Sequence, residues 1–401
     1  MIKKAALIGI GVGMGPLIQL IATPWLSRIY DPTDFGYFAL FVTSVNLLSS
    51  IACLRYETAI PVVESGVLKS IARIALLSTL VTMSLSMLVI WSGIIQNIYP
   101  IFRELDSYIW WIPVAATCGG AMLLVYYLTL RRGEFILNAA IRSLQPIAFV
   151  LLAIFFSKNG LLTAQIVSWL FVVVIGLFYL RKDIFPFERK ALWLTTVRFR
   201  EYPILLTPTS LLDAVALTLP LLFIGSVYGV DATGNYAQIQ RLIGGPLLLF
   251  SAVLGQIFFK YSGELYRAGK SSNKLFWQTI NLLVAVALLL VLFLVFIGEP
   301  ACKFLLGVGW RVDTLFLLLA TIPFLCKSVV SPISTVFLTH HRVNLAMRWQ
   351  VGYFITTFTV LYYASKLLNF EQFLLIYGIH EILMYGVYLG MANRVVANSM
   401  T

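Results

Sequence analysis

The residues of this sequence best suited to chemistry are ionisable side chains inside long apolar runs. They are Asp213, Lys327 and the adjacent pair His380 and Glu381. A charge at the centre of a bilayer costs at least about 2.5–3.5 kcal/mol, so such residues usually face a cavity or pair with one another. A carboxylate beside an imidazole can exchange a proton as its surroundings alternate between water and lipid. We assign Asp213, His380 and Glu381 to ion coupling, with a structural polar pair as the alternative.

A second group of cations lies at or near the ends of apolar runs. Arg28, Arg55 and Arg142 occur in the first half of the chain, and Arg241 joins Lys327 in the second. Snorkelling of the long side chain to lipid phosphates explains any one of them. A guanidinium group also binds phosphate oxygens in bidentate fashion. Taken together, the five cations favour an anionic cargo, and we predict that they bind its pyrophosphate and sugars.

The sequence contains no residue set typical of catalysis, metal binding or a bound cofactor. Its four cysteines, Cys53, Cys118, Cys302 and Cys326, are widely spaced and form no CxxC pair, so we interpret them as small apolar packing residues. We find no phosphate-binding loop, no His/Cys cluster and no Ser-His-Asp candidate set. We expect a protein without enzymatic activity, metal or cofactor.

The composition is that of a membrane protein that crosses the bilayer many times. Hydrophobic residues make up 60% of the chain and charged residues 11%, whereas a soluble domain has about 25% charged residues. The apolar runs are about 20 residues long and unbroken, which indicates helices rather than the alternating strands of a barrel. The net charge of +12 comes from residues between the runs, so we expect no nucleic-acid partner.

Twelve apolar runs carry the ionisable residues and must position them. They lie at about 5–27, 36–54, 74–95, 109–130, 138–157, 161–180, 204–228, 236–259, 275–297, 314–338, 344–365 and 373–393. A basic linker from Arg181 to Arg200 divides them into two sets of six. We predict an all-α integral membrane protein of two six-helix bundles, residues 1–187 and 188–401, related as parallel repeats with the substrate path between them.

Two glycine patterns accompany these runs. Gly36-Tyr37-Phe38-Ala39 is echoed by Gly234-Asn235-Tyr236-Ala237, each after an acidic turn and each opening a new run, which suggests a duplicated bundle. Gly9, Gly11, Gly13 and Gly15 alternate along the first run at GxxxG spacing. We interpret them as a close helix-packing surface.

The distribution of Lys and Arg predicts the orientation in the membrane. With both termini in the cytoplasm, the inner segments hold 21 of these residues and the outer segments 7, apart from Lys327 within a run. Cytoplasmic connections retain such an excess. We therefore expect both termini and the central linker on the cytoplasmic side.

The first 65 or so residues carry a recognisable pattern. It consists of a run closing on Leu26-Ser-Arg28, a turn with Pro32-x-x-Phe35-Gly36-x-x-Ala39, and the segment Arg55-Tyr-Glu-Thr-Ala-Ile-Pro61. This pattern resembles the Wzx-type O-antigen and polysaccharide flippases of the multidrug/oligosaccharidyl-lipid/polysaccharide (MOP) exporter superfamily. The pattern of runs extends the resemblance over the whole chain.

The resemblance implies a MOP/MATE-like fold and a flippase that works by alternating access. The implied cargo is an oligosaccharide or O-antigen unit on undecaprenyl pyrophosphate, used in polysaccharide and lipopolysaccharide synthesis. The implied location is the bacterial cytoplasmic (inner) membrane, with membrane lipid, a glycan polymerase and a chain-length regulator as further partners.

Three other functions stay open at this point. A cation-coupled drug exporter of the same superfamily should have an acidic cavity, whereas the charge balance here is basic. A membrane glycan polymerase or transferase should have a large outer loop or domain, and the longest outer connection, at about residues 298–313, is short. The sequence does not exclude a scaffold for glycan enzymes.

The orientation can be tested by labelling single cysteines in place of Lys190 and Asn398. Both positions should react only after the cells are permeabilised, because the positive residues concentrate on the predicted cytoplasmic side. Labelling of either position from the periplasm of intact cells would overturn the predicted topology.

Overall fold

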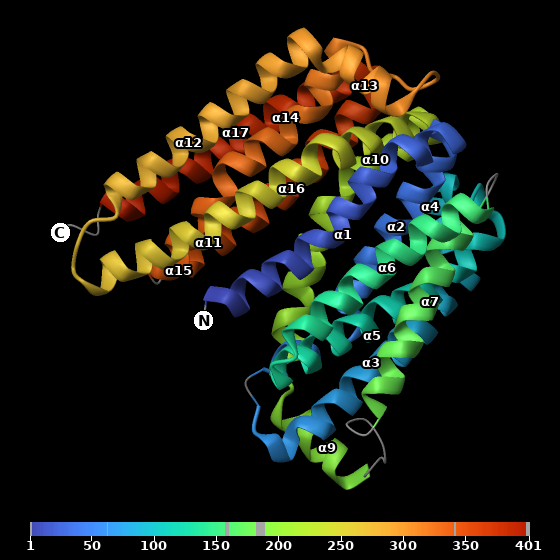
Figure 1. Ribbon diagram of the computed structural model, residues 1–401, viewed down its shortest axis with the longest axis vertical. Helices are drawn as coiled ribbons and strands as arrows, with labels where there is room; N and C mark the ends of the chain where they lie inside the picture. Colours follow the sequence, from blue (N-terminus) through green and yellow to red (C-terminus); the bar gives the residue numbers. More distant parts are fainter. Residues whose placement is uncertain (1, 62, 157–159, 182–188, 341, 398–401) are drawn as a thin grey trace. The chain divides into compact units, whose positions relative to one another are not determined.

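The computed structural model describes residues 2–61, 63–156, 160–181, 189–340 and 342–397, and nearly all of them are helical (Figure 1). No strand occurs among these residues. The chain divides into two compact units, Met1–Gly234 and Asn235–Thr401. The boundary predicted near residue 187 falls within residues 182–188, outside the described part of the chain, as does Asn398, and the division into repeats stays a prediction.

The first unit contains six long helices before the basic segment and part of a seventh after it. Their bounds are α1 Ile2–Ile29, α2 Pro32–Ala52, α3 Ser65–Trp91, α5 Trp111–Arg132, α6 Phe135–Phe156, α7 Leu161–Tyr179 and α10 Thr207–Ile239. Shorter elements are α4 Ile94–Ile98 and α9 Arg189–Arg198, together with the turns at Tyr56–Ala59, Pro100–Arg103, Asp106–Trp110 and Tyr202–Leu206. Helix α1 packs along α6, and α5 packs against α2, α3 and α7.

The second unit begins near the end of α10 and is built mainly on α14 and α17. Its elements are Gln240–Gly244, α11 Gly245–Arg267, α12 Asn273–Phe293, Leu294–Gly298, α13 Glu299–Leu306, α14 Thr314–Val330, Ser331–Thr335, α15 Val336–Thr339, α16 Val343–Leu367 and α17 Phe370–Ala397. Helix α17 packs against both α14 and α16. The ionisable residues of the second half lie on these elements.

The helices agree with the twelve predicted spans. Nine helical runs among the described residues are long and apolar enough to cross a membrane. One of them, Tyr202–Arg267, is interrupted at Gly229, whose φ of 89° and ψ of 173° are not helical, and it therefore covers two predicted spans. Helices α1, of 28 residues, and α16, of 25 residues, correspond to the two remaining predicted spans.

The turn before α2 is fixed by a pair of aspartates. The side chain of Asp31 accepts a hydrogen bond from the N–H of Asp34 at 2.9 Å, and the side chain of Asp34 accepts one from the N–H of Asp31 at 3.3 Å. This reciprocal capping satisfies N–H groups that the first turn of a helix leaves unpaired. The acidic turn of the sequence pattern therefore has a structural role.

The two glycines of the echoed pattern meet within the first unit. A Cβ on Gly36 would overlap the backbone of Val230, and a Cβ on Gly234 would overlap the backbone of Pro32. Thr33 also donates a hydrogen bond to the carboxylate of Asp231 at 3.4 Å. The start of α2 and the last turns of α10 thus approach backbone to backbone, which only glycine permits at these two positions.

Arg311 joins three segments of the second unit. Its guanidinium contacts Glu371 and also Asp313, the latter at 2.9 Å, and its backbone N–H donates to the side chain of Asn235 at 2.8 Å. Burial alone raises the pKa of Asp313, but hydrogen bonds from the Phe316 N–H and from Arg311 outweigh it and lower that pKa. The starts of α14 and α17 are held together by this cluster.

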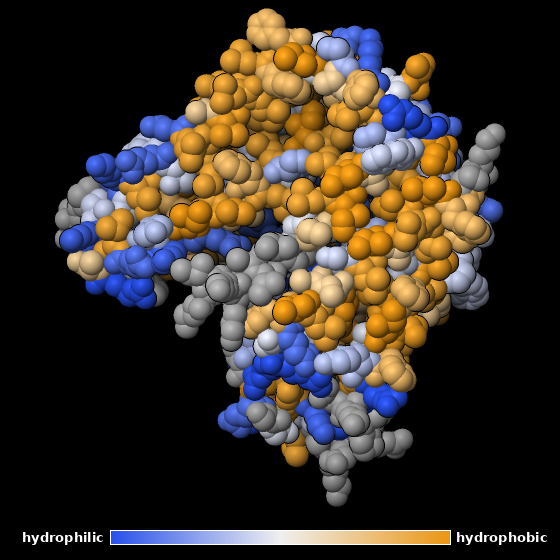
Figure 2. Space-filling view, in the orientation of Figure 1, coloured by the Kyte–Doolittle hydropathy of each residue, from blue (hydrophilic) through white to orange (hydrophobic). Residues whose placement is uncertain are grey.

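Exposed side chains divide by polarity along the helices. On the face seen in Figure 2, hydrophobic residues cover the middle of the helices in each unit and hydrophilic residues gather toward their ends. Large apolar residues such as Phe155, Phe296 and Leu367 are more than three-quarters exposed. A surface of this kind is stable only in an apolar environment. Together with the long apolar helices, it shows that the chain is a multi-pass membrane protein.

The glycine contact can be tested by adding one methyl group. Gly36→Ala or Gly234→Ala should destabilise the protein by about 1–3 kcal/mol, the usual cost of overpacking. Gly13→Ala is the matched control, because a Cβ there meets nothing within 4 Å. Thermal unfolding in detergent measures the effect, and equal melting temperatures for all three variants would contradict the close contact.

Candidate functional site

A buried polar network links α16 to α17 in the second unit. The Tyr353 hydroxyl donates to the Glu381 carboxylate, 3.0 Å from Oε1 and 3.1 Å from Oε2. The His380 imidazole lies 3.3 Å from Oε1 through Nδ1 and 3.1 Å from the Thr356 hydroxyl through Nε2. Exposure is only 7% for His380 and 2% for Glu381. The structure therefore brings the predicted His-Glu pair together with two partners.

Aromatic rings pack around the Tyr353 side of this network. Trp349 stacks on Tyr353 with ring centroids 4.9 Å apart, and Trp349 and Tyr353 also contact Tyr385 at 5.6 Å and 6.0 Å. The indole of Trp349 donates to the carbonyl of Met384 at 3.1 Å, which fixes the ring against α17. A carboxylate in such a low-dielectric site is stable only while its hydrogen bonds are made.

The network can accept or release one proton without losing its hydrogen bonds. The Thr356 hydroxyl lies 2.9 Å from the carbonyl of Gly352 as well as 3.1 Å from His380 Nε2. Its single proton can be donated to His380 when Nε2 is an acceptor, or to Gly352 when Nε2 carries its own proton. Thr356 is thus suited to both protonation states of His380.

Two further cations of the second unit lie on neighbouring elements. Lys327 is partly buried in the last turn of α14, the helix that packs against α17. Arg241 is partly buried in the π-helical turn Gln240–Gly244, and the glycine that ends this turn packs against the ring of Phe324 on α14. Both cations engage other groups of the protein. Their role in substrate binding stays a prediction.

Arg142 is held in a defined orientation on α6 of the first unit. Its Nε donates to Asn138 Oδ1 at 2.9 Å, and its guanidinium lies 4.0 Å from the centroid of the Tyr126 ring. Asn138 uses both amide protons elsewhere, on the Tyr126 carbonyl and the Thr129 hydroxyl at 2.9 Å and 2.8 Å, so its oxygen must face Arg142. No carboxylate of the described residues pairs with Arg142.

Arg55 has a different environment. Its backbone is left-handed, with φ 62°, in the turn after α2, and its Nη1 lies 3.5 Å from Oε1 of Glu57, which is 1% exposed. Burial raises the pKa of Glu57, and Arg55 opposes this shift. Arg131 donates to the carbonyls of Ile60 and Pro61, both at 2.9 Å. The Arg55–Pro61 segment is therefore a tightly bonded turn, and a contact of Arg55 with substrate stays a prediction.

The other two predicted residues of the first unit are exposed. Arg28 ends α1, and its Nη1 donates to the carbonyl of Pro24 at 3.0 Å. Asp213 is exposed on α10 and engages another group of the protein. Arg28 and Arg142 are not neighbours. Tyr30, two residues after Arg28, donates a hydrogen bond to the carbonyl of Ala153, and Ala153 lies about three helical turns beyond Arg142 on α6.

Sequence reasoning missed Tyr353 and Thr356, and also the Asn138 and Tyr126 that orient Arg142. Aromatic residues in apolar runs are most often interfacial anchors. A usable signal existed in α6, where Asn138 and Arg142 are four residues apart and so share a helix face. No comparable spacing joins α16 to α17. Among the described residues no group of three or more His, Cys, Asp or Glu could hold a metal ion.

Two kinds of comparison place this architecture among known proteins. Residues 25–313 match the family model described as "Polysaccharide biosynthesis protein". No match was found among curated protein sequences.

Solved transporter structures share the fold. An inward-facing multidrug resistance MATE family transporter of the MOP superfamily matches with a TM-score of 0.72 at 13% identity, covering 98% of each chain. A MOP superfamily transporter from Pyrococcus furiosus, described as having a binding pocket of reversed polarity that suggests a different function, matches with 0.63 at 13% identity over 100% and 96%. A Vibrio cholerae MATE transporter matches with 0.59 at 11% identity over 99% and 96%.

The family match covers well over half of the chain, and the structural matches extend over its full length. The protein therefore belongs to the polysaccharide biosynthesis protein family and has the fold of the MOP-superfamily transporters.

Proposed function

We propose that this protein is a flippase that moves an oligosaccharide linked to a polyprenyl pyrophosphate, such as undecaprenyl pyrophosphate, across the bacterial inner membrane by alternating access. Membership of a polysaccharide biosynthesis family supports a glycan cargo, and the MOP-type fold supports transport rather than catalysis. The lipid link and an O-antigen unit as the sugar are what the resemblance of the first 65 or so residues to Wzx-type flippases implies.

Arg142 is the observation that carries the anionic part of the cargo. Asn138 holds its Nε and the Tyr126 ring lies against its plane, so the guanidinium keeps one orientation. Neither Nη atom has a hydrogen-bond partner among the described residues. A fixed guanidinium with two adjacent donors matches a phosphate group in bidentate geometry, and such charge-assisted bonds are about twice as strong as neutral ones.

The runner-up, a cation-coupled drug exporter, is favoured by the likeness to multidrug MATE transporters. A site for cationic drugs needs an unpaired carboxylate, but Glu381, the buried carboxylate of α17, is bonded to Tyr353 and His380. Arg142, in contrast, is an oriented cation that pairs with no carboxylate of the described residues. The Pyrococcus furiosus relative is a precedent for a pocket of reversed polarity in this superfamily.

The buried network is assigned to coupling in this proposal. A proton that enters at His380 or Glu381 changes the charge between α16 and α17, so it favours one packing of these helices over another. Asp213 is a second titratable group of the proposed coupling. A glycan polymerase and a chain-length regulator are the proposed downstream partners, with both termini cytoplasmic.

The proposal can be tested by complementing a deletion strain. Loss of the gene should lower surface glycan and leave lipid-linked oligosaccharide on the cytoplasmic leaflet, and the wild-type gene should restore export. Arg142→Gln should restore less than about one tenth of it, the effect of losing one charge-assisted contact, and Arg142→Lys should restore it only partly. Surface glycan per molecule of inserted protein is the measurement.

Arg132→Gln is the matched control for Arg142. It lies at the end of α5 in the same unit, also near a tyrosine ring, but pairs with Glu134 at 3.8 Å. Its loss should leave export near the wild-type level. Full export by Arg142→Gln at normal protein level would remove the residue-level support for an anionic cargo, and unchanged lipid-linked glycan after deletion would refute the flippase.

Coupling is tested separately by Glu381→Gln. Glutamine keeps an acceptor for Tyr353 but cannot exchange a proton, so export should fall at every external pH, while the melting temperature stays near that of the wild type. Export of glycan is measured at several external pH values. Full, pH-dependent export by both Glu381→Gln and Asp213→Asn would exclude these carboxylates from coupling.

Tyr353→Phe separates structure from coupling. It leaves the buried Glu381 carboxylate without its hydroxyl donor and should cost about 1–3 kcal/mol of stability. Tyr363→Phe on the same helix is the control, because the Tyr363 ring is 59% exposed and its hydroxyl has no hydrogen-bond partner among the described residues.

A further inference from the structure

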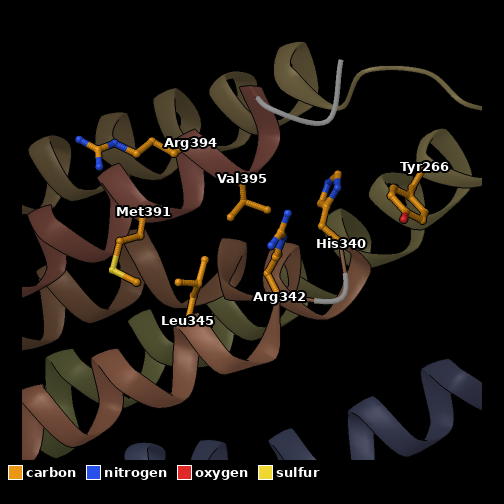
Figure 3. Close-up of a pocket in the computed structure, with 7 residues that line it drawn as sticks. All are labelled: Tyr266, His340, Arg342, Leu345, Met391, Arg394 and Val395. Carbon is orange, nitrogen blue, oxygen red and sulfur yellow. The ribbon is translucent and has the colours of Figure 1, made fainter. Parts of the chain in front are cut away.

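A cavity of about 540 Å³ opens at one end of the second unit, away from the His-Glu network. Its walls come from the last turn of α11, from His340 and Arg342 beside α15 and α16, from the first turn of α16 and from the last turns of α17 (Figure 3). The residues that line it are Tyr266, His340, Arg342, Leu345, Met391, Arg394 and Val395. None of them is acidic, so the cavity has a cationic character.

The two arginines of the cavity lack carboxylate partners. Arg342 precedes α16, Arg394 lies near the end of α17, both are exposed, and neither forms an ion pair with any described residue. Figure 3 shows Arg342 and His340 extending in the same direction, with Arg394 along the other edge. The edge of the Tyr266 ring meets the ring of His340, with centroids 4.9 Å apart. All four residues line the cavity, with the Arg394 guanidinium extending away from the other three (Figure 3).

The remaining wall is apolar. Leu345, Met391 and Val395 are partly buried and line the rest of the cavity. A free inorganic anion gains nothing from such a wall, whereas the glycerol and first methylenes of a lipid are stabilised by it. Cationic donors beside an apolar wall at the end of membrane helices match a phospholipid headgroup.

We propose that this cavity binds the phosphate headgroup of an anionic membrane lipid. Arg342 and Arg394 contact phosphate oxygens, and a lipid with two separate phosphate groups, such as cardiolipin, can use both. The apolar wall receives the start of the acyl chains. The topology predicted from the Lys and Arg count places this end on the cytoplasmic side, where the leaflet is negatively charged. The site is independent of the proposed cargo contact at Arg142.

The test is a lipid titration of the purified full chain in detergent, followed by thermal unfolding. Cardiolipin should raise the melting temperature, and phosphatidylcholine should not. Arg342→Gln and Arg394→Gln should each raise the half-saturating cardiolipin concentration about tenfold, which corresponds to the loss of one charge-assisted contact. Inorganic pyrophosphate should compete with cardiolipin, since both present phosphate oxygens.

Arg348→Gln is the matched control, because Arg348 is an exposed cation of the same helix that does not line the cavity. It reports the bulk attraction between a basic surface and anionic lipid, and its half-saturating concentration should stay within about twofold of the wild type. Arg342 precedes α16 and Arg394 lies on α17. If Arg342→Gln lowers the melting temperature in phosphatidylcholine alone, Arg394→Gln therefore still tests the site.

Equal cardiolipin affinity for the wild type and both cavity variants would overturn the proposal. A response to pyrophosphate without one to cardiolipin would overturn the lipid as the source of the phosphate. Equal weakening by Arg348→Gln would show bulk attraction and also overturn the site.

Discussion

The cost of placing a polar group in hydrocarbon determines how this protein is built. A helix satisfies its own backbone, so the described residues are almost all helical, but each charged side chain within a span still needs a partner or water. The structure meets this requirement in different ways at different residues. Glu381 bonds to Tyr353 and His380, whereas Arg142 is oriented by an amide and a ring and pairs with no carboxylate among the residues that the structure describes.

This difference separates residues with a structural role from those with a proposed functional one. Arg55 and Arg131 are bonded to the turn that follows α2, and Arg311 joins the starts of α14 and α17. Their guanidinium groups form ion pairs with carboxylates or donate hydrogen bonds to backbone carbonyls. Arg142, Arg342 and Arg394 have no carboxylate partner in the described part of the chain, so an anion from outside the protein can complete their coordination.

Much of the fold could be predicted from the sequence, because hydrocarbon thickness sets span length and apolar runs show it directly. The break at Gly229, which divides the longest helical run, also falls between two predicted spans. The repeated Gly36 and Gly234 indicated a duplicated motif, yet their backbone contact could not be inferred, since a packing partner distant in sequence leaves no periodic signal.

The site was less predictable. His380 and Glu381 stood out because ionisable residues are rare in apolar runs, but Tyr353 and Thr356 did not, since tyrosine and threonine are common in membrane helices. Arg55 and Arg142 received the same prediction from sequence, because both lie at or near the ends of apolar runs. The structure separates them through the neighbours that decide whether a cation is paired: Glu57 for Arg55, and Asn138 with Tyr126 for Arg142.

The most direct measurement is translocation by the purified protein. Vesicles would carry polyprenyl-pyrophosphate oligosaccharide labelled in the inner leaflet, and an external glycosidase would cut only the molecules that reach the outer leaflet. The account predicts that wild-type protein exposes the oligosaccharide much faster than empty vesicles do, and that Arg142→Gln protein largely fails to do so. Equal exposure with wild-type protein and with empty vesicles, in the presence of a proton gradient of either direction, would contradict the flippase.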